Sequence, residues 1–328
     1  MSDTDDSLDQ SNSHSISGHK DGNFVTTGDR HRFAGIPTFL RAPLVQDGDT
    51  PTIGIFGVPY DGGIIRTPGT RFGPRGIRNC CWRVEQFDPE LGVNPFEMHD
   101  IVDFGDLILS PFSVDDAMES IEKGAAKLLD RDIVPIAIGG DHFITHPLLR
   151  AIHKKHGDVA VIHFDAHTDT ATEAYGQKFN HGTMFRHAVA EGILDPKKFI
   201  QVGIRKVFGD DEFDFHEEHG IEVISAERLR EIGAAGLKER FARFQGDKVY
   251  VTFDIDFVDA AHAPGVGSPE LGGPSSSETM AAIRTLAGLD IIGFDLVEVA
   301  PSYDVRDLTC YLANLVLMAF VSMTPQRS

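Results

Sequence analysis

Cysteine is scarce in this sequence of 328 residues, and its placement excludes two common uses of the residue. The three cysteines are Cys80, Cys81 and Cys310, and no two of them form a CxxC pair. Adjacent cysteines rarely make a useful disulfide, because the bond has strict geometric requirements. The sequence therefore indicates neither a disulfide framework nor a thiolate zinc site, and its cysteine usage is typical of a reducing compartment.

Long apolar runs are also missing. The sequence contains no stretch of 18 apolar residues and no signal-peptide core, which excludes a membrane-spanning segment by the usual criteria. The apolar stretch Leu308–Val321 is interrupted by Thr309, Tyr311 and Asn314, so it is predicted to be a buried terminal helix. We expect a cytoplasmic protein that does not bind membranes.

Positive charge is in deficit. The chain has 30 Lys and Arg against 50 Asp and Glu, a formal net charge of −20. Nucleic acid is excluded as a partner, since phosphate binding needs clustered cations. The negative field would attract a cationic substrate, although solubility alone also explains it.

The remaining composition indicates one globular domain behind a tail. Residues 1–32 are rich in Ser and Asp and carry few apolar side chains, so they are predicted to be a flexible acidic tail. Residues 33–328 show no linker or repeat and are predicted to be a single catalytic domain. With 41% hydrophobic residues in the whole chain, this domain can bury a sizeable core.

Eight short apolar runs predict the strands of a parallel sheet. They are rich in β-branched residues and continuous rather than alternating, as strands covered on both faces should be. The runs are Ile53–Val58, Ile101–Phe104, Ile133–Ile138, Val159–Phe164, Phe199–Ile204, Ile221–Ile224, Val249–Phe253 and Ile291–Val297. Helical spacing of apolar residues over 114–129, with Ser113 as N-cap, and a helical stretch over 226–241 predict an alternating α/β fold.

Histidines and carboxylates follow four of these runs directly. Carboxyl ends of parallel strands form the ligand crevice of an open sheet, so these residues should meet at one edge. They are Asp141 and His142, then Asp165, His167 and Asp169, then Asp254 and Asp256, and finally Glu298.

This set of residues predicts a site for two metal ions. Four carboxylates and two imidazoles are too anionic to pack without cations, and two divalent ions would neutralise the carboxylates. Mostly oxygen donors with some imidazole favour Mn²⁺, with Ni²⁺, Co²⁺ or Fe²⁺ as alternatives. A lone DxD or GGDH is common on ordinary turns, so the prediction depends on the motifs occurring together.

The motifs resemble the ureohydrolase family of arginases and agmatinases, from about Gly35 to the C-terminus. They are Gly139–His142 (GGDH), Phe164–Asp169 (FDAHTD), His181–Phe185 (HGTMF), Phe253–Asp256 (FDID) and Val297–Pro301 (VEVAP). The resemblance implies a three-layer αβα fold around an eight-stranded, mainly parallel sheet. It also implies a homotrimer or homohexamer, and a mixed assembly with a second subunit is the alternative.

The resemblance also implies which residues hold each ion. The first ion would be held by His142, Asp165, Asp169 and Asp254. The second would be held by His167, Asp165, Asp254 and Asp256. Asp165 and Asp254 would then bridge the two ions.

Three residues are assigned to the reaction on the same basis. His181 is the candidate proton shuttle, because imidazole titrates near neutrality. Glu298 would accept hydrogen bonds from the guanidinium group and orient it. Asp169 belongs to the catalytic set as well as to the ligands, whereas Asp141 and His163 are predicted to support the ligands.

The substrate is predicted only as a guanidino compound that yields urea and an amine. The loop over 170–180 differs from that of arginases, which disfavours L-arginine. Agmatine and a guanidino acid such as 4-guanidinobutanoate are equally favoured, and the candidate residues for the distal end of the substrate are Arg66, Glu173, Tyr175 and Lys178.

Departures from the family pattern leave further alternatives open. Arg71-Phe72-Gly73-Pro74 and the segment over 259–270 differ from the usual motifs. A remodelled pocket could therefore serve guanidine, an N-alkylated guanidine or a biguanide such as metformin, with nickel as the metal. A zinc-dependent deacetylase of related fold and a non-catalytic subunit are the alternatives of other classes.

Overall fold

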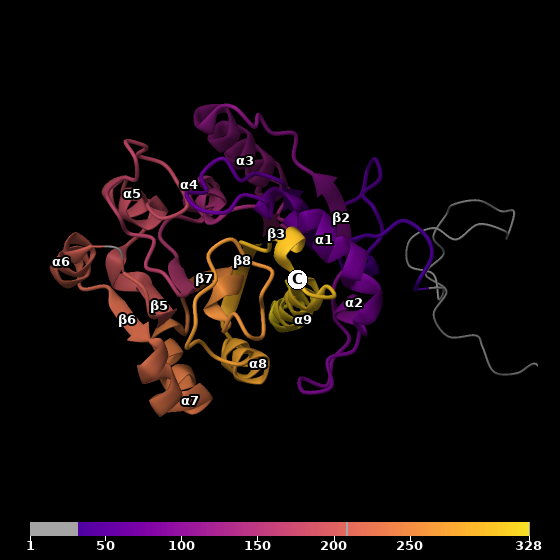
Figure 1. Cartoon of the computed structure of the whole chain (residues 1–328). Helices are drawn as coiled ribbons and strands as arrows, with labels where there is room; N and C mark the ends of the chain where they lie inside the picture. Colours follow the sequence, from indigo (N-terminus) through magenta and orange to yellow (C-terminus); the bar gives the residue numbers. More distant parts are fainter. Residues whose placement is uncertain (1–31, 208, 328) are drawn as a thin grey trace, which may run out of the picture.

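An eight-stranded sheet forms the centre of the computed structural model, which describes residues 32–207 and 209–327. Neighbouring strands pair in parallel throughout, in the order β2-β1-β3-β8-β7-β4-β5-β6 (Figure 1). All eight predicted strands are confirmed, and the predicted tail lies almost wholly outside the described residues. The strands are β1 Ile53–Val58, β2 Ile101–Asp106, β3 Val134–Gly139, β4 Ala160–Phe164, β5 Phe199–Ile204, β6 Glu222–Ser225, β7 Lys248–Asp254 and β8 Asp290–Val297.

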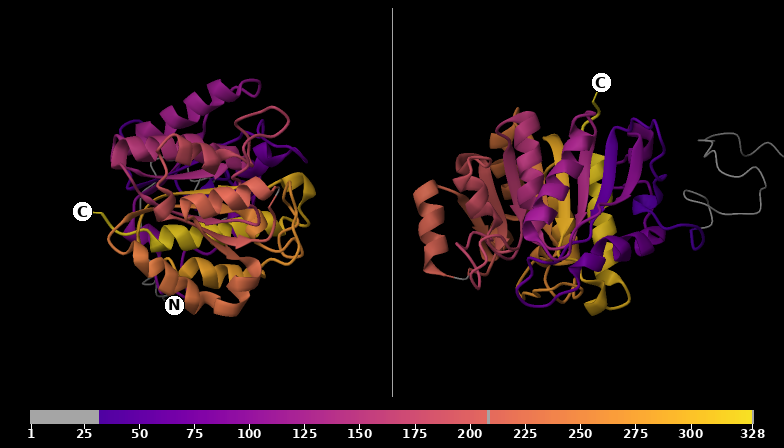
Figure 2. Two further views of the ribbon diagram at one scale, coloured as in Figure 1. Left: turned by 90° about the vertical axis from the view of Figure 1, so that its left-hand side faces the viewer. Right: turned by 90° about the horizontal axis from the view of Figure 1, so that it is seen from above.

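Helices cover both faces of the sheet, which confirms the three-layer αβα fold (Figure 2). One layer holds α3 (Val114–Leu129), α4 (Thr145–His156) and α5 (Met184–Ala190). The other holds α1 (Gly73–Cys80), α7 (Ala226–Phe241), α8 (Ser276–Arg284) and α9 (Leu308–Met323). The short α2 (Pro95–Met98) lies near α9, and α6 (Asp210–His219) lies at the β6 end of the sheet (Figure 1).

Burial on both faces explains why the strand sequences are continuously apolar. In β7, Val249 and Val251 enter the core cluster that includes residues of α7, α8 and α9, whereas Tyr250 between them enters the cluster that includes residues of α3 and α4. Side chains of a strand alternate between faces, so both kinds of position need apolar residues here. The sheet therefore separates two hydrophobic cores.

The predicted helices are present, and their ends have identifiable causes. The side chain of Ser113 accepts a hydrogen bond from the backbone N–H of Asp116 at 3.1 Å, which confirms it as the N-cap of α3. The terminal helix α9 is buried along most of its length, and Asn314 inside it donates to the carbonyl oxygens of Ile77 and Cys310. No helix among the described residues is long and apolar enough to cross a membrane.

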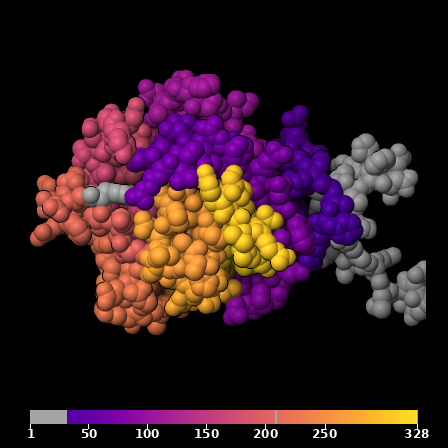
Figure 3. Space-filling view, in the orientation of Figure 1, coloured from indigo at the N-terminus to yellow at the C-terminus, as the bar shows by residue number. Residues whose placement is uncertain are grey.

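The four central strands end side by side at one edge of the sheet. In spatial order they are β3, β8, β7 and β4, although β4 and β8 lie far apart in sequence. Figure 3 shows one face of the molecule, on which indigo, orange and yellow segments that lie far apart in sequence adjoin. The loops that leave these four strands carry the predicted donor residues.

Candidate metal centre and substrate pocket

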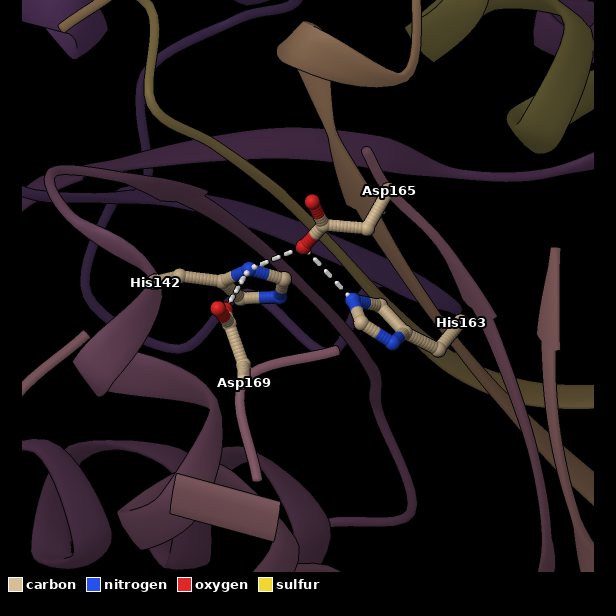
Figure 4. Close-up of side chains that lie close together, drawn as sticks. All are labelled: His142, His163, Asp165 and Asp169. Atoms are coloured by element: carbon tan, nitrogen blue, oxygen red, sulfur yellow. Dashed lines mark hydrogen bonds and ion pairs between the residues drawn. The ribbon is translucent and has the colours of Figure 1, made fainter. Parts of the chain in front are cut away.

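One predicted imidazole faces three predicted carboxylates. His142 follows β3, and its Nδ1 atom lies 3.0 Å from an oxygen of Asp165, 3.0 Å from one of Asp169 and 3.2 Å from one of Asp254 (Figure 4 shows the first two contacts). All four residues are buried. Donor atoms bound to one divalent cation at ~2.0–2.2 Å lie about 3 Å apart at right angles. The spacing therefore fits a shared ion.

The hydrogen bonds behind His142 determine which ring nitrogen carries the proton. The Thr252 hydroxyl donates to Asp295 at 2.7 Å, so its oxygen is the acceptor for Nε2 of His142 at 2.8 Å. Asp295 also accepts from Tyr250 and Thr145. The proton on Nε2 leaves the Nδ1 lone pair free to face the carboxylates.

A lone pair pointing at three carboxylate oxygens requires a positive charge between them. Burial disfavours the charged ring, but Asp165, Asp169 and Asp254 outweigh it and raise the pKa of His142 well above its usual range. Burial, followed by the charges of Asp256 and Asp165, raises the pKa of Asp254 well above its usual range. Without a cation the site takes up protons, and a divalent ion would replace them. The residues therefore fit a metal.

A second donor group adjoins the first. Nδ1 of His167 lies 2.8 Å from Asp256 and 3.4 Å from Asp165, while its Nε2 lies 3.5 Å from Glu270. Burial, and then the Asp165 charge, raises the pKa of Asp256 to about 7. Asp165 belongs to both groups, and Asp254 accepts the backbone N–H of Asp256 at 2.8 Å. The structure thus brings together all six residues predicted as ligands.

His163 contacts the site without competing for the ion. The side-chain amide of Gln201 donates to the carbonyl oxygen of Thr168 at 2.6 Å, which orients its NH₂ group. The same NH₂ lies 3.0 Å from Nδ1 of His163, so Nδ1 is the acceptor. Nε2 therefore carries the proton and donates it to Asp165 at 2.7 Å (Figure 4). This arrangement supports Asp165, as the sequence predicted.

Glu298 and His181 contact each other beside the donor cluster. Oε1 of Glu298 accepts from the backbone N–H of His142 at 3.0 Å and contacts Nδ1 of His181 at 3.1 Å. Oε2 of Glu298 is buried and has no hydrogen-bond partner. Nε2 of His181 accepts from the backbone N–H of Ile65 at 3.3 Å. A buried carboxylate oxygen without a donor costs free energy, so this atom is suited to an N–H group of a ligand.

The pKa of His181 suits proton transfer near neutrality. Burial lowers it, but the hydrogen bond to Glu298 and the charges of Glu298, Asp169 and Asp141 outweigh burial and raise it to about 8. Nε2 can therefore exist both as an acceptor and as a proton carrier. Nδ1 stays bonded to Glu298 in either state, which keeps the ring oriented.

A cavity at this edge joins the donors to the surface. Four of the predicted ligands line this cavity, namely His167, Asp169, Asp254 and Asp256. The other lining residues are His181, Glu298, Ile65, Arg66, Gly182 and Ser268. Of the four residues predicted for the distal end of the substrate, Arg66 is in this wall. Glu173, Tyr175 and Lys178 are not, because the loop turns back through paired hydrogen bonds between Ala174 and Gln177 and leaves their side chains exposed.

Steric crowding requires glycine at position 140, the second residue of the glycine pair before Asp141 and His142. Gly140 adopts φ +54°, and a Cβ atom there would lie 2.5 Å from the carbonyl oxygen of Val58 and 2.4 Å from that of Tyr60. Only glycine fits such a close approach in the left-handed region. The turn carries Asp141 inward, where it accepts from the backbone N–H of Gly63 at 2.7 Å.

Several residues that support the donors were missed by the sequence analysis. Thr252 and Asp295 hold His142, Gln201 holds His163, and Glu270 contacts His167. Three of them, Thr252, Asp295 and Gln201, stand in the interior of strands whose other interior residues are almost all apolar. A polar residue in the interior of a buried strand could therefore have identified them as supporting residues.

Comparison with known proteins identifies relatives of both sequence and fold. Residues 51–322 match the model of the arginase family. A guanidinobutyrase of Pseudomonas aeruginosa is 39% identical over 302 residues, which are 90% of this chain and 94% of the relative. The structure of proclavaminate amidinohydrolase from Streptomyces clavuligerus has a TM-score of 0.86 at 37% identity, over 89% of this chain and 98% of that one. A formiminoglutamase of Trypanosoma cruzi described with Mn²⁺ has a TM-score of 0.79 at 25% identity, over 88% and 99%.

Proposed function

This chain belongs to the arginase family, and we propose that it is a binuclear-metal amidinohydrolase that splits a guanidino compound into urea and an amine. The observation that carries the proposal is the buried, unpartnered Oε2 of Glu298 in the wall of the cavity that holds the donor cluster. A guanidinium group offers N–H donors and a positive charge, and a carboxylate is its natural acceptor.

The proposed mechanism assigns a step to each of these residues. His142, Asp165, Asp169 and Asp254 would hold one ion, and His167, Asp165, Asp254 and Asp256 the other. Held there, two such ions would supply a water of lowered pKa and would stabilise negative charge that develops in the transition state. Glu298 orients the guanidinium. His181 carries a proton on Nε2 to the leaving amine, while its Nδ1 donates to Glu298.

The metal is proposed to be Mn²⁺. The donors are mainly carboxylate oxygens with two imidazoles, which suits Mn²⁺, and the formiminoglutamase relative is described with that ion. Ni²⁺ is the second candidate. We further propose a homo-oligomer of three or six subunits in the cytoplasm.

The favoured substrate class is a guanidino acid such as 4-guanidinobutanoate. Arg66 lies in the wall of the cavity, where its side chain is half exposed and its Nη1 lies 3.8 Å from Oε1 of Glu270. With the guanidinium held at Glu298, a distal carboxylate of the substrate would pair with Arg66 in exchange for Glu270, which a distal ammonium cannot do. The guanidinobutyrase relative acts on a compound of this class, as its name states.

An N-alkylated guanidine is the second candidate, on a separate observation. Ile65 also lines the cavity, and the residue is 37% exposed. An apolar wall beside the donors would bury alkyl groups attached to the reacting guanidine. This candidate includes dimethylguanidine and metformin and needs no contact with Arg66.

A urea assay on the purified protein tests the proposed function. It compares 4-guanidinobutanoate, 3-guanidinopropanoate, agmatine, L-arginine, guanidine and metformin, each with added Mn²⁺ or Ni²⁺. We expect urea from a guanidino acid with two ions bound per subunit. One bound ion with amide hydrolysis would indicate the deacetylase alternative. Two bound ions with neither urea nor a free amine released from any compound would indicate a non-catalytic subunit.

Arg66→Met separates the substrate classes. For a guanidino acid, KM should rise by about tenfold, because a half-exposed charged hydrogen bond contributes about 1.4 kcal/mol. For agmatine, KM should stay the same or fall, since a like charge is removed. Arg75→Met, on the exposed surface of α1, is the matched control and should leave KM unchanged for both. An unchanged KM for guanidino acids in Arg66→Met contradicts the assignment.

A further inference from the structure

We propose that Glu212 of α6 is a positioning residue for the metal donor Asp169. It binds the threonines on both sides of Asp169 and so sets where that carboxylate lies. The inference rests on the binuclear site proposed above, and it concerns a residue outside the cavity. Neither Glu212 nor Thr170 lines that cavity, so Glu212 acts through the donor loop and not on the substrate.

The contact between Glu212 and the donor loop is direct and buried. Its Oε2 atom accepts from the hydroxyl of Thr168 and, at 3.0 Å, from the hydroxyl of Thr170. Glu212, Thr168 and Thr170 are each at most 1% exposed. One carboxylate oxygen therefore receives a hydrogen bond from each residue adjacent to Asp169. Charge-assisted hydrogen bonds of this kind are among the stronger ones in proteins.

A second residue of α6 completes the chain of hydrogen bonds. Nε2 of His216 lies 3.3 Å from the hydroxyl oxygen of Thr170. Because that hydroxyl donates to Glu212, the imidazole must be the donor to Thr170. The Thr170 side chain is thus held from two sides by residues one helical turn apart on α6.

Asp169 needs this support because of its backbone. Its φ of +51° lies in the left-handed region, which Asp adopts more readily than most residues but still at a cost that the surroundings must offset. The conformation aims the carboxylate at Nδ1 of His142, 3.0 Å away. A shift of the loop by a fraction of an ångström would alter that contact. Glu212 acts on both residues that flank the strained position.

Further hydrogen bonds join α6 to the segment over 168–172. Arg186 of α5 donates to the carbonyl oxygen of Thr170 at 2.5 Å and to the carbonyl oxygen of Asp211 at 3.0 Å. The Thr172 hydroxyl donates to the Asp211 carboxylate at 3.1 Å. Asp211 and Glu212 of α6 therefore bond three threonines of the segment over 168–172, and Glu212 bonds the two that are adjacent to Asp169.

The test measures metal binding to the folded protein. Glu212→Gln and the double variant Thr168→Val/Thr170→Val are compared with wild type by Mn²⁺ titration and by electron paramagnetic resonance, which distinguishes a coupled ion pair from a single ion. Loss of a group that supports a ligand typically weakens metal affinity by about 10–100-fold. We expect Mn²⁺ affinity to fall by this factor at the first proposed site, which includes His142 and Asp169. At the second proposed site, which includes His167 and Asp256, affinity should stay within about threefold of wild type.

The controls separate positioning from a general role in folding. Thr168→Ser and Thr170→Ser keep the hydroxyl groups and should bind both ions like wild type. Glu218→Gln, at an exposed position on the same helix, should change neither site. If Glu212→Gln does not fold, the threonine variants decide the question alone.

Two results would overturn the proposal. One is unchanged affinity at both sites in the Glu212 or the double threonine variant. The other is an equal loss at both sites together with a lower melting temperature. Wild-type protein that binds two ions yet releases no urea would instead count against the proposed function and leave the metal-binding comparison intact.

Discussion

Replacing Asp254 by asparagine is expected to lower kcat for urea release by at least about 10³-fold, which corresponds to several kcal/mol of lost transition-state stabilisation. Asp254 stands at the end of β7, 3.2 Å from Nδ1 of His142, and accepts the backbone N–H of Asp256. It is one of the two proposed bridging donors. A neutral amide has nearly the same shape but cannot neutralise the charge of either ion.

Steady-state urea assays and metal analysis on the same preparation measure this effect. Asp254→Asn should retain less than two ions per subunit. Asp290→Asn is the matched control, because Asp290 begins β8 on the surface and pairs with Arg327. Turnover of Asp254→Asn within tenfold of wild type would show that Asp254 is not a bridging ligand.

Replacing His181 by asparagine is expected to lower kcat by about 10²–10⁴-fold, the usual contribution of a positioned acid or base. Metal content should remain at the wild-type level, because His181 is not among the proposed ligands. His262→Asn, at an exposed position in the loop after Asp256, should behave like wild type. Loss of bound metal in His181→Asn would argue for a ligand role instead.

The pH profile gives a second measure of the same residue. Glu298 and nearby carboxylates raise the pKa of His181 to about 8 against the effect of burial, so its ring stays protonated at neutral pH and loses the proton above it. A group that must donate a proton then makes kcat fall as pH rises. Bound cations lower that pKa, which places the descending limb at or below about pH 8. This limb should be absent in His181→Asn.

The strands and the six donors were predictable because each carries a signal in the local sequence. Continuous apolar runs such as Ile53–Val58 occur where helices cover both faces of a strand. Asp165, His167 and Asp169 follow such a run directly, and parallel strands bring their ends together. The assignment of the donors to two ions came from the resemblance to the ureohydrolase family.

The supporting residues were less predictable, because their partners are far away in the chain. Glu212 stands in the run Asp210-Asp211-Glu212, which resembles any acidic helix start. Only the placement of α6 beside the loop after β4 reveals its role. Lys178 was predicted to contact the distal end of the substrate, because it lies close in sequence to the donor motif. The loop turns outward, and the Lys178 side chain is exposed.

The position of the donors within the sheet also bears on how the molecule opens. They leave β3, β7 and β4, with Glu298 after β8, and these four strands occupy the middle of the sheet. The end strands β2 and β6 carry none of them. Transient opening of a protein starts where few neighbours hold a segment, as at a sheet edge. Fraying at the β2 margin would therefore leave the donors in place, whereas fraying at β6 would reach α6 and its contact with the loop around Asp169. Exchange of amide hydrogens should be slowest in the central strands that bear the donors.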